Sequence, residues 1–183
     1  MNRKLLVFVT LMALAITSAV AGMKNPTVGG QEMYPNKNII ENAVNSADHT
    51  TLVAAVKAAG LVETLEGPGP FTVFAPTNEA FAKLPAGTVD TLVKPENKAT
   101  LTKILTYHVV AGRLGEHELM KMIKAGGGKA ELTTVAGGKL WAMQNGKNIV
   151  LKDEKGETAT ITIGNVFQSN GVIHVVDSVL MPN

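Results

Sequence analysis

The stretch PFTVFAPTNEAFAKLP, residues 70–85, decides the fold because it combines a strand, a sharp break and a helix start. Phe71, Val73 and Ala75 recur at every second residue, which is the spacing of a β-strand. Phe74 adds a large apolar side chain to the opposite face. Strands that are apolar on both faces lie in the middle of a fold. We therefore predict a central strand that is covered on both faces.

The second half of this stretch predicts how the strand ends and a helix begins. Pro76 has no N–H to donate to a neighbouring strand, so the ladder stops there. Thr77 can cap a short helix, and Glu79 places an acid in the first turn, where the helix dipole favours it. Pro85 would end that helix. So dense an apolar stretch indicates a folding nucleus and not a reaction centre.

The first 21 residues carry the pattern of a signal peptide. Arg3 and Lys4 precede an apolar segment over residues 5–16, and the sequence AVA at residues 19–21 fits a cleavage site. An uncleaved N-terminal anchor is the alternative interpretation. Cleavage would remove two of the 17 Lys and Arg residues and leave 15, equal to the 15 Asp and Glu residues. A neutral mature chain gives no electrostatic sign of nucleic-acid binding.

The composition indicates an exported domain that is held together by its own core. The chain has no cysteine, so no disulfide and no lipid-modified N-terminal cysteine is expected. Asn25 is followed by proline, which blocks the N-glycosylation pattern. Beyond the leader, no apolar stretch approaches the roughly 20 residues of a membrane span. We therefore predict a bacterial protein that is periplasmic or secreted.

Periodicity divides the remaining chain into a helical first half and a strand-rich second half. Residues 22–37 form an arm, and a single domain is predicted over residues 38–183. Helical spacing predicts helices over residues 38–44, 50–59, 87–93, 98–105 and 117–124. Alternation and turn residues such as Asn145-Gly146 predict strands over residues 107–110, 130–135, 139–144, 148–153, 158–164 and 171–180. This arrangement is typical of an α+β, β-rich fold.

The helix expected over residues 50–59 has recognisable ends. Asp48 or Thr50 can cap its start. Gly60 fits the left-handed position that follows many helices. Residues 61–65 would then form a short turn before the central strand.

No sequence motif predicts a catalytic or metal site. HELMK at residues 117–121 begins like a zinc-binding helix, but Lys121 stands where the second histidine belongs. A hydrolase that uses Ser169 or a His174–Asp177 pair is the enzymatic alternative. Side chains three residues apart on a strand point to opposite faces, which argues against that pair. We therefore predict that the protein is not an enzyme.

The four histidines fall into two groups. His49 and His117 lie in polar surroundings and are expected to be solvated. His108 and His174 interrupt apolar strands, where a hydrogen-bonded structural histidine is more frequent than a metal ligand. A pair of them could still titrate near neutral pH or bind a metal, although the sequence supplies no third ligand.

Three separated stretches resemble the conserved boxes of the fasciclin (FAS1) domain family. They are residues 69–85, ILTYHVVAG at residues 104–112 with its Tyr107–His108 pair, and SNGVIHVVDSVLMP at residues 169–182. The resemblance covers residues 36–182, and the arm is similar to the start of bacterial single-domain secreted members. It implies a wedge-like β-sandwich of about seven strands with several helices packed around it. In that fold the first and third stretches form adjacent central strands.

The resemblance also implies a function. Members of this family are extracellular or periplasmic adhesion and interaction modules without an established catalytic site. Animal members present an Asp-Ile motif to integrins just before the third stretch, whereas this chain has Asn165 and Val166 there. Integrin binding through that motif is not expected, because the carboxylate is missing.

We predict a non-catalytic binding module that mediates cell adhesion or association with a surface or matrix. It would act as a monomer without cofactor or metal, and its partner would be a protein or glycan at a cell surface or matrix. Because loops carry function more often than strands, residues 165–170 and 94–98 are the first places to look. The candidate binding residues are Tyr107, His108, Asn165, Val166, Gln168 and Asn170.

A carrier of haem or lipid that uses an apolar cleft is the alternative function. It is suggested by the methionines at positions 120, 122 and 143 and by His108 as a ligand. Methionine also fills gaps in ordinary cores, so the two interpretations of these residues stay open.

Overall fold

The computed structural model describes residues 24–183, so the predicted signal peptide lies outside the described residues. The described chain is a mixture of helices and strands, which confirms the α+β prediction. None of its helices combines the length and the apolar composition of a membrane span. In chain order the elements are α1 (Ile39–Ala43), the 3₁₀ turn η1 (Ala47–His49), α2 (Thr50–Ala59), α3 (Val62–Glu66), β1 (Phe71–Pro76), α4 (Asn78–Ala82), α5 (Thr88–Leu92), the 3₁₀ turn η2 (Pro95–Asn97), α6 (Lys98–Tyr107), β2 (Val109–Ala111), α7 (Glu116–Ala125), β3 (Lys129–Thr133), β4 (Lys139–Asn145), β5 (Asn148–Lys152), β6 (Thr158–Gln168) and β7 (Gly171–Val176).

The strands of the described chain join one sheet in the order β2-β1-β7-β6-β5-β4-β3. β1 and β7 are parallel neighbours, and the other neighbouring pairs are antiparallel. Phe71 lies opposite Gly171, and Val73 lies opposite Ile173. A side chain on Gly171 would collide with the carbonyl of Phe71, so glycine is required for the two strands to meet there. The prediction that these two stretches form adjacent central strands is confirmed.

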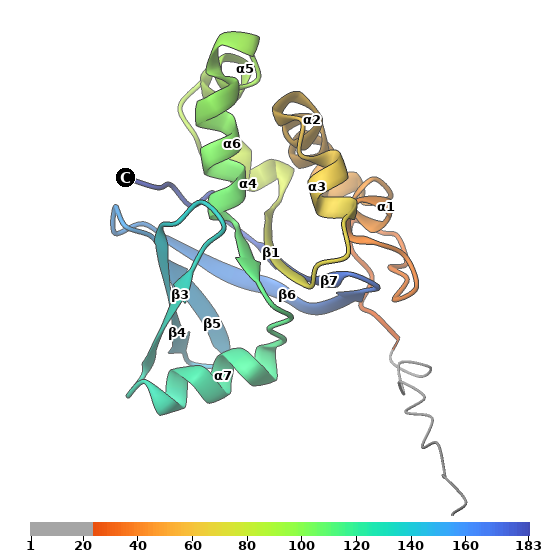
Figure 1. Cartoon of the computed structure of the whole chain (residues 1–183). Coiled ribbons are helices and arrows are strands. Elements are labelled where there is room, and N and C mark those ends of the chain that lie inside the picture. The colour runs from red at the N-terminus through yellow and green to blue at the C-terminus, as the bar shows by residue number, and fades with distance from the viewer. Residues whose placement is uncertain (1–23) are drawn as a thin grey trace, which may run out of the picture.

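Strand β6 bends the sheet. Its register against β7 shifts between Ile161 and Ile163 and again between Ile163 and Val166. Such bulges bend a strand and increase its twist. β6 pairs with β5 through its first residues and with β7 through the rest, so it belongs to both halves of the sheet. Figure 1 shows β6 as the long strand between the half formed by β3, β4 and β5 and the half formed by β2, β1 and β7.

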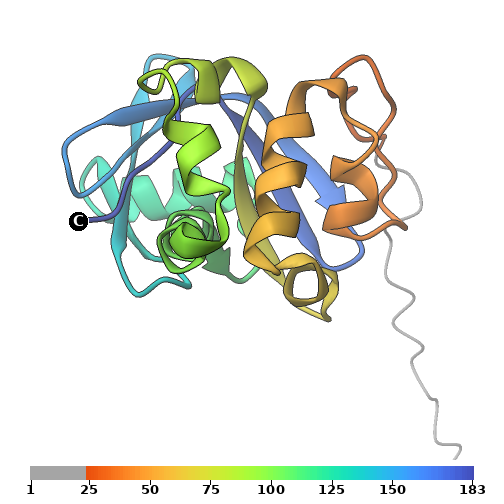
Figure 2. The ribbon, with the colours of Figure 1, turned by 90° about the horizontal axis from the view of Figure 1, so that it is seen from above.

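Strand β1 separates two hydrophobic cores. Val73 and Ala75 pack against helices α1–α6 in what we call the helix core. Phe74 points the other way, into what we call the strand core, with Tyr107, α7 and the inner face of β3–β6. Figure 2 shows the N-terminal helices as a layer over the sheet, and Figure 1 shows α7 at the opposite end of the molecule. Both faces of β1 are covered, as predicted.

Two of the predicted helix ends are confirmed and one is wrong. Thr77 caps α4 by accepting a hydrogen bond of 3.1 Å from the N–H of Ala80, and Gly60 ends α2 with a φ of 71°. Both predictions are confirmed. The predicted cap of α2 by Asp48 or Thr50 is wrong, because residues 47–49 form η1. The side chain of Asn78, the first residue of α4, accepts from the N–H of Thr51 at 3.0 Å instead.

Several predicted boundaries are wrong for tertiary reasons. The strand expected from residue 107 begins at Val109, because Tyr107 is the last residue of α6. The expected loop at residues 165–170 is strand β6 as far as Gln168. Residues 61–65 lie mostly in helix α3 and are not a turn. His49 is buried and not solvated, whereas His117 is exposed on α7, as predicted.

Candidate functional site

None of the six predicted binding residues is exposed in the structure. Tyr107, His108, Val166, Gln168 and Asn170 are buried, and Asn165 is partly buried. Those at positions 165–170 lie together on β6 and the turn that follows it, whereas Tyr107 and His108 lie at the end of α6. The six therefore form no single surface, and their role in binding stays a prediction.

Tyr107 ties α6 to the strand half of the sheet. Its hydroxyl donates to the carbonyl of Lys139 at 2.6 Å and accepts from the N–H of Glu154 at 3.1 Å. Burial raises the pKa of Tyr107 to about 12, so the phenol stays protonated and can donate. The side chain has no polar atom left for a ligand.

His108 lies at the seam between the two cores. Its Nδ1 donates to the carbonyl of Ile104 at 2.8 Å, and its Nε2 accepts from the N–H of Leu180 at 3.0 Å. Ile104 belongs to the helix core and Leu180 to the strand core. Burial lowers the pKa of His108 to about 4, so the ring is neutral at physiological pH. With both nitrogens occupied, His108 has none free for a haem iron or a metal.

Asn165 fixes the start of α7 from the neighbouring strand. Its φ is 58°, a left-handed conformation that asparagine tolerates better than most residues. Its Oδ1 accepts from the N–H of Glu116 at 2.8 Å, and its Nδ2 donates to the Glu116 carboxylate at 2.6 Å. Its own N–H faces Nδ1 of His174 at 3.4 Å, and Nε2 of His174 donates to the carbonyl of Leu114 at 2.7 Å. This polar group joins β6, β7 and the segment that leads into α7.

Asn170 performs a similar task in the helix core. Its Oδ1 accepts from the N–H of Ile39 at 3.0 Å, and its Nδ2 donates to the carbonyls of Leu65 and Gly67 at 2.7 and 2.8 Å. The β6–β7 turn is thereby tied to α1 and α3. Gln168 differs, because both polar atoms of its buried amide lack a partner among the described residues.

An apolar cleft lies in the helix core, at a position that the sequence analysis did not indicate. It has a volume of about 70 Å³ and lies between the helices and the sheet. Its wall includes Ile39 on α1, Val56 on α2, Leu65 on α3, Leu105 on α6, and Val73 and Ile173 on the sheet. Each of these residues has the periodicity of an ordinary core position, so no sequence signal distinguishes a cleft from a closed core.

The chemistry of this cleft suits an apolar group. A space of this size exceeds what one water needs, yet it is smaller than the roughly 150 Å³ cavity that holds benzene. Burial lowers the pKa of His49 in its wall, which favours the neutral ring. The nitrogens of this ring lie 2.8 Å from the Ser46 hydroxyl and 3.4 Å from the Ala75 carbonyl. Lys57 is the charged side chain among the lining residues, and it is exposed at the rim.

Metal ligands do not gather elsewhere in the part of the chain that the structure describes. Within residues 24–183, no group of three or more His, Cys, Asp or Glu side chains could hold a metal ion. The polar groups described above serve instead to join distant segments of the backbone.

Comparison with known proteins gives a consistent family assignment. The Fasciclin domain family model matches residues 47–182. Protein sll1483 of Synechocystis sp. is 44% identical over 183 residues, covering 92% of this chain and 93% of the relative. Cell surface glycolipoprotein MPB83 of Mycobacterium bovis is 36% identical over 174 residues, covering 87% of this chain and 67% of the relative.

The fold also matches a solved structure. A FAS1 domain pair from the insect cell adhesion molecule Fasciclin I superposes with a TM-score of 0.71 over 80% of this chain, at 17% sequence identity. The described chain matches 51% of that domain pair. At this identity the comparison establishes a shared fold.

Proposed function

The chain belongs to the fasciclin domain family, and from this membership we propose that it is an exported, non-catalytic binding module that mediates adhesion or association with a cell surface or matrix. The observation that carries the proposal is the family match over residues 47–182. The relative MPB83 is named as a cell surface glycolipoprotein, which supports a surface location. Export through a signal peptide, to the periplasm or beyond, is part of the proposal.

The polar side chains support a non-catalytic role. The carboxylate of Asp177 accepts from the N–H of Thr160 at 2.8 Å, while His174 bonds the Leu114 carbonyl and faces Asn165. The two residues considered for a hydrolase therefore serve different backbone groups. Asn165 and Val166, which stand where animal members carry their integrin motif, are used in the interior of the fold, so we propose a different contact surface.

A retention assay tests this function. The chain from residue 22 onward is immobilised, and surface-labelled envelope fractions and intact cells are passed over it. We expect material to be retained by the folded chain and not by the same chain after thermal denaturation. Equal retention on both surfaces, or none on either, would contradict the adhesion proposal.

A small-ligand carrier is the second candidate, and the apolar cleft is the observation that favours it. The occupied nitrogens of His108 argue against haem, and the volume of about 70 Å³ limits a guest to a small apolar group such as the end of an acyl chain. Met120, Met122 and Met143 do not line it, so the methionines give this candidate no support. Native mass spectrometry of the protein purified from its own host tests it, together with an absorbance titration with haem. A clean ligand-free mass that no lipid or haem addition shifts would remove this candidate.

A further inference from the structure

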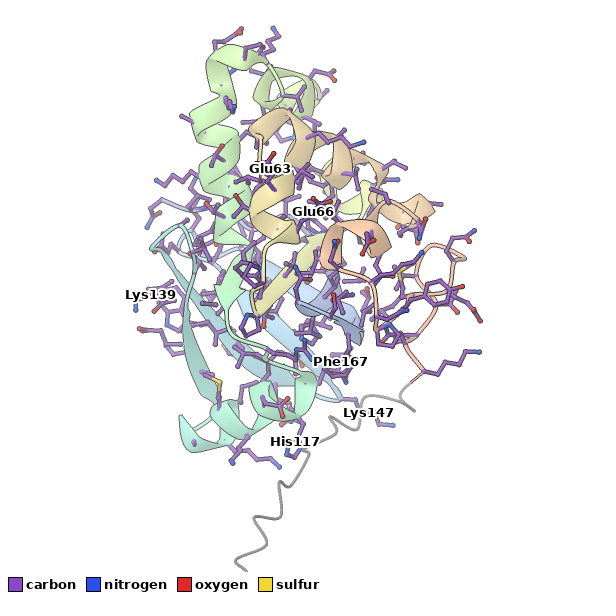
Figure 3. The ribbon with its side chains drawn as sticks, turned by 45° about the vertical axis from the view of Figure 1, so that its right-hand side comes forward. Glu63, Glu66, His117, Lys139, Lys147 and Phe167 are labelled. Carbon is purple, nitrogen blue, oxygen red and sulfur yellow. The ribbon has the colours of Figure 1, made fainter. Side chains whose placement is uncertain are left out.

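The outer face of the β3–β5 half of the sheet lies open, in contrast to its inner face. Burial alternates along β3, β4 and β5, so that residues such as Leu132, Leu140 and Leu151 enter the strand core. Their neighbours along each strand point outward and are exposed or partly exposed. In Figure 3, Lys139 extends from this face away from the body of the molecule.

The single tryptophan of the chain lies on this open face and not in a core. Trp141 on β4 lies opposite Glu131 on β3 and Lys152 on β5. Met143, two residues further along β4, lies opposite Val150. We call Trp141, Met143 and Val150, with the lysines at positions 129, 139 and 152, the Trp141 face.

The Trp141 face carries an excess of positive charge. Lys139 forms an ion pair with Glu131, with 2.9 Å between Nζ and Oε1. Lys129 holds its Nζ 5.6 Å from the centre of the Trp141 ring, and Lys152 forms no ion pair with a carboxylate of the described residues. The face thus carries three lysines and one glutamate, whereas the chain without its expected leader is neutral overall.

This combination of groups selects a particular chemistry. The electron-rich face of an indole ring attracts cations and the polarised C–H groups of a sugar ring. The Lys129 contact shows that the ring can be reached from solvent, and this exposed lysine can swing toward an anion. Ammonium groups pair strongly with carboxylates and sulfates. Strand β6 adds two threonine hydroxyls next to this face, since Thr158 lies opposite Lys152 and Thr160 lies opposite Val150.

The shape of the face favours a polysaccharide over a protein partner. Protein hot spots are aromatic or arginine anchors that fill well-packed pockets. The Trp141 face is instead a run of side chains on paired strands, and its partly exposed tryptophan projects from it. An extended acidic polymer can lie along such a face and contact the ring and the lysines at once.

We propose that the Trp141 face binds an acidic polysaccharide, with a sugar ring against Trp141 and its carboxylate or sulfate groups near Lys129 and Lys152. This inference rests on the proposed function, for which it names the class of partner. The binding is electrostatic in part, so it weakens as salt rises.

The lone tryptophan makes the experiment direct, because its fluorescence reports on this face alone. The mature chain is titrated with alginate as a polyuronate, heparin as a sulfated polymer and dextran as a neutral control. We expect the fluorescence to change with at least one acidic polymer, with an affinity that falls between 50 and 300 mM salt, on the order expected for screened charges. Dextran should produce no change.

Variants locate the binding. Trp141→Ala and the double variant K129Q/K152Q should each weaken binding of the acidic polymer about tenfold in affinity electrophoresis, as expected for central contact residues. The double variant K121Q/K124Q removes the same charge from exposed positions on α7 and should change affinity less than about twofold. Circular dichroism confirms that each variant is folded.

The other outcomes overturn the inference in distinguishable ways. Absence of binding to both acidic polymers, or equal binding to dextran, would overturn it. Stronger binding to poly-glutamate than to the polysaccharides would replace the glycan by an acidic protein segment. Binding that survives both Trp141→Ala and K129Q/K152Q would move the site to another surface. If all these results are negative while the retention assay succeeds, the adhesion proposal stands and only this inference fails.

Discussion

The helix core and the strand core are built on the same central strands, yet they pack differently. In the strand core, Phe74, Tyr107, Leu140, Leu151 and Leu180 each have 0% of their surface exposed. The helix core instead contains a cleft of about 70 Å³. Helices α1, α3, α4 and α5 have five residues each, too short to present the long ridges that interlock in helix packing. A sheet that folds over itself closes its core, whereas a set of single-turn helices leaves space.

The largest effect is expected from Phe74, which anchors the strand core. Its ring is fully buried and stacks on His174 with 5.8 Å between the ring centres. Phe74→Ala should lower the free energy of unfolding by about 3–5 kcal/mol. A urea melt measures this loss. A loss under about 1 kcal/mol would mean that the strand core is not the tighter of the two.

Acid should lower the stability of the fold by protonating His108, which lies between the two cores. The pKa of His108 is about 4 in the folded protein and about 6.5 when unfolded, so the unfolded chain binds more protons between these values. The contribution of the neutral His108 ring to the free energy of unfolding is therefore fully present above about pH 6.5. About 3 kcal/mol of it is lost as the pH drops toward 4. Burial lowers the pKa values of His49 and His174 as well, which adds to the same trend.

Urea melts at several pH values between 8 and 4 test the acid prediction. His108→Gln serves as the comparison, because glutamine can keep a hydrogen bond but does not titrate. We expect a smaller pH dependence in that variant. An identical pH dependence in both proteins would assign the acid sensitivity to other groups.

Removing the hydrogen bonds by which Asn170 joins the helices to the sheet should lower the free energy of unfolding by a smaller amount. Asn170→Ala leaves the buried N–H of Ile39 and the carbonyl of Leu65 without their partner. We expect a loss of about 2–3 kcal/mol in the free energy of unfolding. The exposed neighbour is the control, since Ser169→Ala should change stability by less than about 0.5 kcal/mol. Equal effects of the two variants would show that Asn170 does not join the helices to the sheet.

The smallest effect compares the free space in the two cores directly. Val56→Ile adds a methylene at the wall of the cleft and should change stability by less than about 1 kcal/mol, because space is available. Ala142→Val adds two carbons in the strand core, where Ala142 has 0% exposure, and should cost about 1–3 kcal/mol. Thermal melts of both variants measure the difference. A larger cost for Val56→Ile would show that the cleft is closed in solution.

Local chemistry predicted some parts of this structure well. The alternation in residues 70–85, the cap at Thr77 and the glycine after α2 depend on near neighbours in the chain, and each is confirmed. The family resemblance predicted the pairing of β1 with β7. That pairing joins residues about a hundred positions apart, which periodicity alone does not reveal.

Features that depend on distant neighbours were missed. Asp48 and Thr50 were both acceptable caps for α2, but Asn78 at the start of α4 takes that role. His49 has polar neighbours in sequence, yet the fold buries it with its Nε2 3.4 Å from the Ala75 carbonyl. Residues 165–170 contain polar residues typical of a loop, whereas their side chains bond α1, α3 and α7 as part of the β6–β7 hairpin. The cleft has no sequence signal because it arises from how separate helices fit together.

The parallel pairing of β1 with β7 has a consequence for how the protein folds. β1 lies early in the chain and β7 is its last strand, so the centre of the sheet has a high contact order. Helices α2 and α6 can form soon after they are made, but neither core is complete until β7 arrives. The chain should therefore remain open to proteases and chaperones until its last strand is synthesised, and folding should be slow for a domain of its size.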